Sequence, residues 1–240
     1  MGSKRKLATR ILEKITQRHN GITDFYDLFG GGGSISFTAI RDYRFNVHYN
    51  ELNKRIYSLV EYLKTHKELE PKFYEWVTRE EFFNQVNKTN DEADWYSGFV
   101  MSCWSFGNSQ NSYLYGADIE NIKRLESNII VDKCKKSNLE FSDIYNISVN
   151  EELFNINSLL KRLELFIKFL RNNDFEKKDI GRQVQNLERL RLLLNILDIK
   201  NLQNLQTYNK SYQDIKIIGN NPIIYCDIPY KGTGEYKEGG

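Results

Sequence analysis

The feature that most constrains the fold of this sequence is a run of four glycines, Gly30 to Gly33, which separates two apolar segments of different pattern. The segment before it, ITDFYDLF, is typical of a short strand, and ISFTAI after it favours a helix. Glycines directly after a strand let the chain pass close to a ligand, because they lack a Cβ atom and adopt positive φ at little cost. We interpret the run as a turn of a parallel α/β sheet rather than as a flexible Gly-Ser linker.

The residues around this turn continue the same pattern. Residues 5–18 place apolar side chains at helical spacing, the segment RFNVHYNEL is strand-like, and Asn53 to Leu69 is patterned as a long amphipathic helix. Glu51 stands at the end of the second predicted strand, about 18 residues after Gly33. An acid at that place can accept hydrogen bonds from both hydroxyls of a ribose. This half of the pattern predicts a nucleotide-like ligand.

A second segment with chemical character lies near the C-terminus. Ile223 to Cys226 is predicted to be a buried strand, and Asp227-Ile228-Pro229-Tyr230 follows it. Ligands of open α/β sheets bind at the carboxyl ends of the strands. There the Asp227 carboxylate and the Ile228 carbonyl can each accept a hydrogen bond from an NH₂ group, and Tyr230 can stack on a base, which is worth about 1–3 kcal/mol. The alternative is a strand end followed by an ordinary proline turn.

The middle of the chain, from about 70 to 205, differs from both ends. It is mostly helical and polar, with leucines and isoleucines at three- and four-residue steps in 151–171 and 182–199. Residues 102–116, SCWSFGNSQNSYLYG, form an aromatic and amide-rich loop. The stretch 161–200 holds ten Lys/Arg and six Asp/Glu, a charge of +4 against −2 for the rest of the chain. This bias indicates either a basic binding face or an ordinary solvated helix surface.

Composition narrows the class of protein. A net charge of +2, with 40% hydrophobic and 28% charged residues, is ordinary for a globular chain and excludes a polycation. No apolar run approaches the roughly 20 residues of a membrane span, so we expect no membrane partner. Cys103, Cys134 and Cys226 do not cluster with the three histidines. We therefore expect neither a metal site nor a disulfide framework, and a reducing cytoplasm fits best.

Four motifs resemble, in the same order, those of the adenine-specific DNA methyltransferases that use S-adenosylmethionine, the group of Dam-type and phage enzymes. Gly2-Ser3-Lys4 resembles the opening motif of that family, and Phe29 to Gly33 resembles its FxGxG loop. Asn50 to Asn53 is similar to its ribose motif, and Asp227 to Tyr230 is similar to its DPPY motif. Three positions depart from the family pattern: Ile228 replaces the first proline, Glu51 replaces an aspartate, and Ser211 stands where the family often has an acid.

The resemblance implies an α/β fold, a Rossmann-like sheet of an S-adenosylmethionine-dependent methyltransferase with a mainly helical target-recognition insertion. It places the catalytic methyltransferase domain in 1–69 and 206–240 and the helical DNA target-recognition insertion in 70–205. Only ten residues follow Tyr230, whereas such a sheet would need about three more strands, on the order of 60–90 residues. We therefore expect the C-terminal part of the catalytic domain to lie beyond this sequence. We expect the protein to act in the cytoplasm of a bacterial or phage-infected cell.

The resemblance also implies a reaction: a methyl group passes from S-adenosylmethionine to the exocyclic N6 amine of an adenine flipped out of double-stranded DNA, without a metal. The implied catalytic residues are Asp227, Ile228, Pro229 and Tyr230. The implied cofactor-binding residues are Lys4, Asp27, Phe29, Gly31, Gly33, Ser34, Glu51 and Asp227. Amide and aromatic side chains suit base contacts, and basic side chains suit phosphates. The DNA-binding candidates are Trp104, Asn108, Gln110, Tyr113, Lys168, Arg171 and Arg182, with Lys161, Arg162, Arg189 and Arg191 as further phosphate contacts.

Two other activities and one inactive state remain open on the sequence. Methylation of the exocyclic N4 amine of cytosine would use a similar site, but its family motif usually begins with Ser where this chain has Asp227. A protein-glutamine methyltransferase would have Asn first, which the motif lacks. A catalytically inactive DNA-binding relative would keep the fold, and Ile228 and Ser211 keep that interpretation open.

Overall fold

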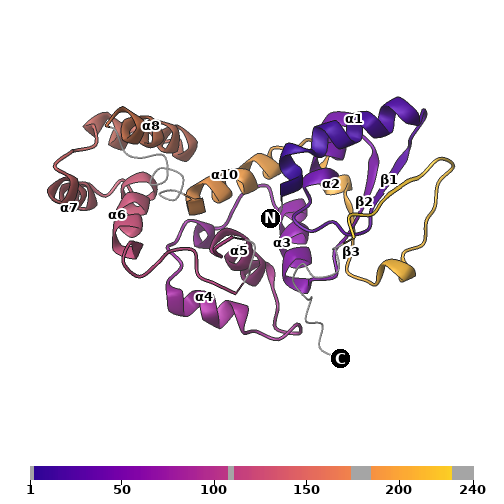
Figure 1. Ribbon diagram of the computed structural model, residues 1–240, viewed down its shortest axis with the longest axis horizontal. Helices are drawn as coiled ribbons and strands as arrows, with labels where there is room; N and C mark the ends of the chain where they lie inside the picture. Colours follow the sequence, from indigo (N-terminus) through magenta and orange to yellow (C-terminus); the bar gives the residue numbers. More distant parts are fainter. Residues whose placement is uncertain (1–2, 108–110, 174–184, 229–240) are drawn as a thin grey trace.

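The parallel sheet predicted from the two ends of the chain is present in the computed structural model, which describes residues 3–107, 111–173 and 185–228 (Figure 1). Within these residues the strands pair in parallel in the order β3-β2-β1-β4. Their bounds are Asp24–Asp27 for β1, Asn46–Asn50 for β2, Gln206–Tyr208 for β3 and Ile223–Tyr225 for β4. Asp27 pairs with Tyr49 on one side and Tyr225 on the other, so the carboxyl ends of β1, β2 and β4 meet at one edge.

Helices from the first 65 residues cover one face of this sheet. They are η1 (Ser3–Lys6), α1 (Ala8–Arg18), α2 (Ser34–Thr38), η2 (Ala39–Tyr43) and α3 (Lys54–Thr65). Phe25, Val47 and Tyr49 of the strands pack with Leu12 of α1 and Ile35 of α2 in one apolar cluster. The helices predicted at 5–18 and from Asn53 onward are confirmed, although the first opens with a 3₁₀ turn and the second ends at Thr65.

The opposite face of the sheet carries polar and aromatic side chains. Tyr26 of β1 and His48 of β2 stack with ring centroids 4.0 Å apart, and His48 Nε2 lies 3.1 Å from a carboxylate oxygen of Asp24. The Tyr26 hydroxyl accepts a hydrogen bond from the backbone N–H of Ile218 (3.0 Å), which holds the segment before β4 over these rings. The alternation of side chains along a strand thus separates an apolar face from a polar one.

β4 differs from its sequence prediction in burial. The sequence predicts a buried strand at Ile223 to Cys226, but Ile224 is 49% exposed and Cys226 is also exposed. A continuous apolar run is typical of a strand covered on both faces. Here Ile223 and Tyr225 pack against the apolar cluster of the sheet, whereas Ile224 points to the other face. Within the described residues β4 pairs only with β1, so the predicted strand is right in position and wrong in burial.

Residues 70–205 are mainly helical where the structure describes them. The elements are η3 (Pro71–Phe73), α4 (Arg79–Val86), α5 (Trp95–Cys103), α6 (Glu120–Val131), α7 (Lys135–Tyr145), η4 (Glu151–Asn155), α8 (Leu159–Asn172), α10 (Gln185–Leu197) and η5 (Leu202–Asn204). The helix predicted at 151–171 divides into η4 and α8, because Asn150 and Ser158 each cap a new N-terminus through a side-chain oxygen.

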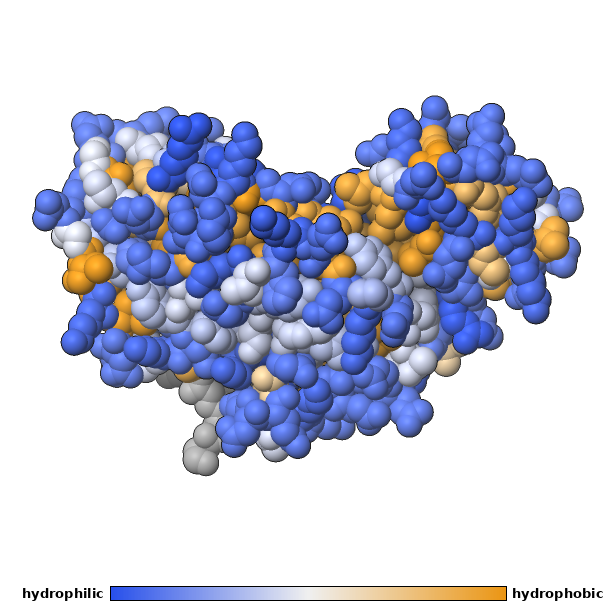
Figure 2. Space-filling view, turned by 180° about the vertical axis from the view of Figure 1, so that it is seen from behind, coloured by the Kyte–Doolittle hydropathy of each residue, from blue (hydrophilic) through white to orange (hydrophobic). Residues whose placement is uncertain are grey.

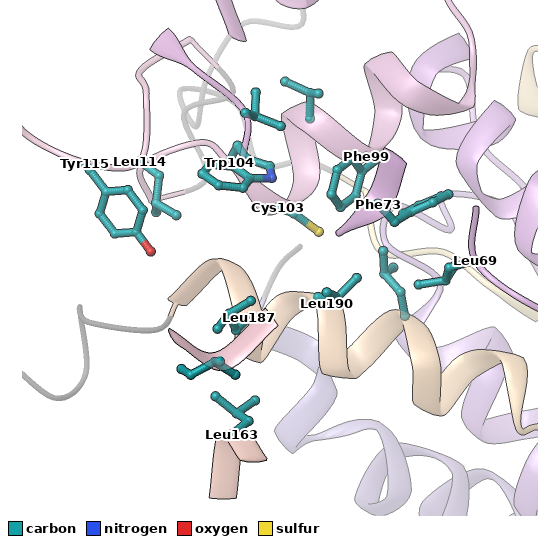
Figure 3. Packing of buried hydrophobic residues seen from close by; sticks show 14 of the residues in the cluster. Leu69, Phe73, Phe99, Cys103, Trp104, Leu114, Tyr115, Leu163, Leu187 and Leu190 are labelled. Carbon is teal, nitrogen blue, oxygen red and sulfur yellow. The ribbon is translucent and has the colours of Figure 1, made fainter. Parts of the chain in front are cut away.

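A second apolar cluster holds these helices together (Figure 3). Leu187 and Leu190 of α10 lie in this cluster together with Phe99 and Cys103 of α5, and all four side chains are buried. α10 therefore returns from the far end of the helical region to pack on its centre, and the chain then re-enters the sheet as β3.

α3 joins the helical region to the strands. Leu59 packs in the helical cluster, whereas Val60 packs in the sheet cluster. α5 approaches α3 so closely that a Cβ atom at Gly98 would lie 2.1 Å from the carbonyl oxygen of Arg55. The molecule is elongated, with the sheet at one end and α7 and α8 at the other, and its space-filling view shows a hollow between the two ends (Figures 1 and 2).

The described part of the chain offers neither a helix that could span a membrane nor a cluster of metal ligands. None of its helices is long and apolar enough to cross a membrane. It contains no group of three or more His, Cys, Asp or Glu side chains placed to hold a metal ion. The three cysteines are free: Cys103 is buried, Cys134 is half-buried and Cys226 is exposed.

Candidate cofactor and catalytic site

The glycine run forms a tight turn at the carboxyl end of β1. The Gly30 N–H donates to the Asn50 carbonyl at the end of β2 (2.8 Å), and the Gly33 N–H donates to the Gly30 carbonyl (2.9 Å). A Cβ atom at Gly30 would lie 2.2 Å from the ring of Tyr49, and Gly33 has a φ of +72°. The Tyr49 hydroxyl donates to the Gly31 carbonyl (2.6 Å). The turn therefore needs glycine at position 30 for space and at position 33 for its backbone conformation.

Glu51, the acid predicted to bind a ribose, lies just after β2 and stabilises this turn through hydrogen bonds. Its Oε2 accepts a hydrogen bond from the Gly31 N–H (2.7 Å), and its Oε1 accepts one from the Asn53 N–H (2.8 Å). Burial raises the pKa of Glu51, and these backbone hydrogen bonds act against that rise. The Asn209 side chain donates to the carbonyls of Glu51 (2.7 Å) and Leu52 (2.9 Å). The carboxylate is thus fixed directly behind the glycine turn.

Asp27, the last residue of β1, is only 2% exposed. Its Oδ2 accepts a hydrogen bond from the Ser36 hydroxyl of α2 (2.8 Å). Burial raises the pKa of Asp27 to about 7, and the negative charges of Glu51 and Asp227 act in the same direction, while the Ser36 hydrogen bond opposes them. Asp27 therefore titrates near neutral pH, and a positively charged partner would stabilise its ionised form.

Lys4 and Asp227 come from opposite ends of the chain and meet at this edge. Lys4 Nζ lies 2.8 Å from Asp227 Oδ1, and about one third of each side chain is exposed (35% and 30%). The Leu28 N–H donates to the Tyr225 carbonyl (3.1 Å), which sets the end of β4 beside the end of β1. The ion pair therefore holds the segment after β4 against the glycine turn.

A cavity of about 100 Å³ lies between these elements. Gly33 is the N-cap residue of α2, and Glu51 holds the Gly31 N–H of the turn; neither residue lines the cavity itself. Ile228 is 62% exposed at the end of the described chain, whereas Pro229 and Tyr230 lie outside the described residues. The predicted cofactor residues that line the cavity are Lys4, Asp27, Phe29, Gly31, Ser34 and Asp227. The structure thus brings these residues together, and their roles stay predictions.

Sequence reasoning misses two neighbours of the site. One is Ser36, whose hydroxyl holds Asp27. The other is Tyr212, which opens η6 (Tyr212–Asp214) and places its ring centroid 5.3 Å from that of Phe29. Ser211, the position where the related enzymes often have an acid, is the N-cap residue of the same turn. Two sequence signals could have identified these residues. Tyr212 is an aromatic residue directly after Ser211, and Ser36 carries a hydroxyl three positions after Gly33.

The predicted aromatic DNA contacts are buried, which corrects the sequence prediction. Trp104 and Tyr113 belong to the helical core, and the Tyr113 hydroxyl donates to the Val77 carbonyl (2.7 Å). An aromatic ring in a polar loop is as suitable for packing as for stacking on a base, and here the packing role holds. Asn108 and Gln110, from the same loop, lie outside the described residues.

The basic residues of 161–200 divide into those with partners within the protein and those that are exposed. Arg162 donates to the carbonyls of α6 and of the turn before α8, and Arg189 donates to the carbonyls of Cys103 (3.0 Å) and Ser105 (2.8 Å). Both guanidinium groups thus have a structural role as donors to backbone carbonyls, and this contact gives no support to the prediction that they bind phosphates. Arg191 pairs with Glu188 (3.2 Å). The remaining candidates are Lys161, Lys168 and Arg171, which are exposed, and Arg182, which lies outside the described residues.

Comparison with known proteins identifies the class to which this site belongs. Residues 1–238 match the family described as D12 class N6 adenine-specific DNA methyltransferase, and the chain belongs to that family. The match spans both the strand region and the helical region. Neither a curated protein nor a solved structure matches the chain. Membership of an adenine-specific family decides between the exocyclic amines of adenine and cytosine in favour of adenine N6 methylation of DNA.

Proposed function

We propose that this chain transfers a methyl group from S-adenosylmethionine to the N6 amine of an adenine flipped out of double-stranded DNA. The observation that carries the proposal is the meeting of Asp227 with the glycine turn in one cavity. The first belongs to the DPPY-like motif and the second to the FxGxG-like loop, and they stand nearly 200 residues apart in the sequence.

The residues around the cavity fit S-adenosylmethionine by their chemistry. Glu51 directly follows β2 with its carboxylate against the turn, where an acid can accept hydrogen bonds from ribose hydroxyls. The buried Asp27 suits the ammonium group of the methionine part. A Cβ atom at Gly31 would meet nothing within 4 Å, so the turn leaves open space on that side. When bound, S-adenosylmethionine supplies an electrophilic methyl group on a cationic sulfur.

Asp227 and the Ile228 carbonyl are the proposed acceptors for the two N–H groups of the adenine amine. The amine is a poor nucleophile while its lone pair is delocalised into the ring. Two acceptors held in place localise that pair on nitrogen and stabilise the positive charge that develops there. Lys4 orients Asp227 through its ion pair. Pro229 and Tyr230 complete the proposed site by motif, with the Tyr230 ring stacked on the flipped base.

These assignments give the two parts of the chain different proposed roles. We assign catalysis to 1–69 and 206–240 and DNA target recognition to 70–205, with Lys161, Lys168, Arg171 and Arg182 as phosphate contacts. Exposure of the first three supports that role. Because counterions are released from DNA when phosphates are neutralised, DNA binding should weaken as salt rises. The proposed place of action is the cytoplasm of a bacterial or phage-infected cell, without a metal or membrane partner.

Methyl transfer to unmethylated double-stranded DNA tests the proposal directly. The wild-type chain should transfer labelled methyl groups from S-adenosylmethionine to adenine, and Asp227→Ala should abolish transfer while keeping at least part of the cofactor binding. Asp198→Ala, an exposed carboxylate at the end of α10, serves as the matched control and should keep wild-type activity. Binding of DNA without transfer by the wild-type chain would instead identify an inactive DNA-binding relative. Near-normal transfer by Asp227→Ala would refute the assignment of the catalytic carboxylate.

A further inference from the structure

A concentrated basic surface lies on η1 and α1, in the strand region of the molecule. Residues 4–19 hold six Lys/Arg and one Glu, a charge of +5 against −3 for the rest of the chain. One of the six cations, Lys4, pairs with Asp227 at the cofactor cavity. The other five are exposed, and in the described part of the chain none of them forms an ion pair: Arg5, Lys6, Arg10, Lys14 and Arg18.

Four of these cations follow one another at regular spacing. Arg10, Lys14 and Arg18 stand at four-residue steps along α1, which places them on one side of the helix about 6 Å apart along its axis. Lys6 precedes Arg10 by the same step, and we call these four residues the basic stripe. Like charges at this spacing repel one another and destabilise a helix, and Glu13 is the one acid among them. A row of phosphates would offset this repulsion, because it presents negative charges at regular intervals.

The packing of α1 keeps the stripe turned toward solvent. Ala8 and Leu12, on the other side of the helix, are 1% and 0% exposed and pack in the apolar cluster of the sheet. The helix is therefore fixed on the strands before any partner binds. Charged side chains on a fixed helix cost less to order than the same side chains on a loop, which favours binding.

The stripe begins beside the proposed catalytic carboxylate. Lys4 of η1 lies 2.8 Å from Asp227, and Lys6 ends the same turn. From there α1 runs away from the helical region over about 16 Å (Figure 1). This length is about half of one helical turn of duplex DNA. A duplex whose adenine reaches Asp227 therefore has phosphates within reach of the first part of the stripe.

We propose that the basic stripe is a second DNA contact, in which Lys6, Arg10 and Lys14 bind phosphates of the duplex beside the flipped adenine. The inference rests on the proposed function, and it adds a contact from the strand region to those proposed for the helical region. Phosphate contacts carry no sequence information, so the stripe fixes the position of the duplex rather than its sequence. Arg18 contributes least, because it lies at the far end of α1 from Asp227.

Two triple variants with the same change of charge test the stripe. The stripe variant is Lys6→Gln/Arg10→Gln/Lys14→Gln. The control variant replaces three exposed lysines outside α1 and is Lys67→Gln/Lys200→Gln/Lys216→Gln. Fluorescence anisotropy with unmethylated duplexes of several sequences, from about 50 to about 200 mM salt, gives the affinity and its salt dependence.

The stripe variant should bind every duplex at least about tenfold more weakly at low salt, and to the same degree whatever the sequence. The slope of log K against log salt should become flatter by about 2–3, because each lost phosphate contact accounts for about 0.9. The control variant should change the slope by less than about 1. Binding of S-adenosylmethionine should stay as in the wild type, since the three stripe residues do not line the cofactor cavity.

The outcomes separate this inference from the function on which it rests. A wild-type chain that binds S-adenosylmethionine but no duplex DNA would overturn both. Wild-type affinity and salt slope in the stripe variant would overturn the inference alone, and so would equal losses in the stripe and control variants. A loss confined to one duplex sequence would also overturn it, because the stripe would then read bases. Should the stripe variant fail to fold, Arg10→Gln and Lys14→Gln alone should each flatten the slope by about 1.

Discussion

The strand region and the helical region both bury charged side chains, but they use them differently. At the carboxyl edge of the sheet, Asp27 and Glu51 are buried beside a cavity and are held by donors from the glycine turn, α2 and the start of α3. In the helical region, the buried Arg162 and the half-buried Arg189 donate to backbone carbonyls at the ends of helices. A buried charge that lines a cavity, as Asp27 does, therefore suggests a ligand site, whereas a buried charge such as Arg162, which lines no cavity and binds only backbone carbonyls, suggests a structural role.

The largest expected effect tests the structural role of the buried Arg162 in the helical region. Arg162→Met removes a charged donor from four backbone carbonyls, those of Ile130, Val131, Ile156 and Asn157. We expect the free energy of unfolding to fall by about 3 kcal/mol, because buried carbonyls then lack partners. Urea unfolding followed by circular dichroism measures it.

The neighbouring residue supplies the control for Arg162. Lys161 is exposed on the same turn of α8, so Lys161→Met should change the free energy of unfolding by less than about 0.5 kcal/mol. A variant Arg162→Met that keeps wild-type stability but loses affinity for DNA would contradict the structural role of Arg162. The arginine would then belong to the DNA-binding surface.

The second effect concerns the ion pair at the site. Lys4→Met should lower the rate of methyl transfer about 10²-fold, because Asp227 loses the partner that orients it. The free energy of unfolding should change by less than about 1 kcal/mol, since the pair is partly exposed. Lys88, which pairs with Asp94 in the helical region at similar exposure, provides the matched control. Lys88→Met should leave the transfer rate unchanged, and an equal loss in both variants would refute the special role of Lys4.

A third effect separates the glycine turn from glycines elsewhere. Gly30→Ala would place a Cβ atom 2.2 Å from the buried Tyr49 ring, so we expect a loss of about 1–3 kcal/mol in stability and weaker cofactor binding. At Gly116 the Cβ atom would meet only the exposed Asp118 carboxylate, which can move. Gly116→Ala should therefore be close to wild type in thermal unfolding and in cofactor affinity. Equal effects in the two variants would show that the turn is not specially packed.

The site was largely predictable because its chemistry lies in short segments beside strands. The glycine turn, Glu51 and Asp227 each follow an apolar run, and the parallel sheet brings the carboxyl ends of those runs together. The sequence could not give the contacts between segments. The Ser36 hydrogen bond to Asp27 and the contact between Tyr212 and Phe29 depend on how α2 and η6 pack at that edge.

The helical region was less predictable because its residue types fit two roles equally well. Trp104 and Tyr113 suit base stacking by composition, yet α4, α5 and α10 enclose them in one core. Arg162 suits phosphate binding, yet it completes the ends of α6 and the turn before α8. Whether a side chain of this region is buried depends on helices that are distant in the sequence. A local sequence pattern therefore cannot predict it.

The smallest effect is a pH dependence that only the site should display. The pKa of Asp27 is raised to about 7, chiefly by burial. If the ionised form binds the cationic cofactor, affinity should rise about tenfold from pH 6 to pH 8 and then level off. The stability of the unliganded protein should change in the opposite sense and fall as pH rises from about 4 to 7, because the folded state then holds a proton that the unfolded state has lost. The groups that face Asp27 are Ser36, Glu51, Asp227 with its partner Lys4, and the Cys226 thiol.

A second buried acid, in the helical region, serves as the control for Asp27. Glu126 of α6 is buried in the helical region beside Lys123, and burial raises its pKa, while the charge of Lys123 opposes that rise. Both acids influence stability as pH changes, so cofactor affinity rather than stability is the measurement that separates them. Asp27→Asn should flatten the pH profile of cofactor affinity, and Glu126→Gln should leave the profile as in the wild type. A profile that responds to Glu126→Gln would mean that the helical region is coupled to the cofactor cavity, and the contrast between the two regions would not hold.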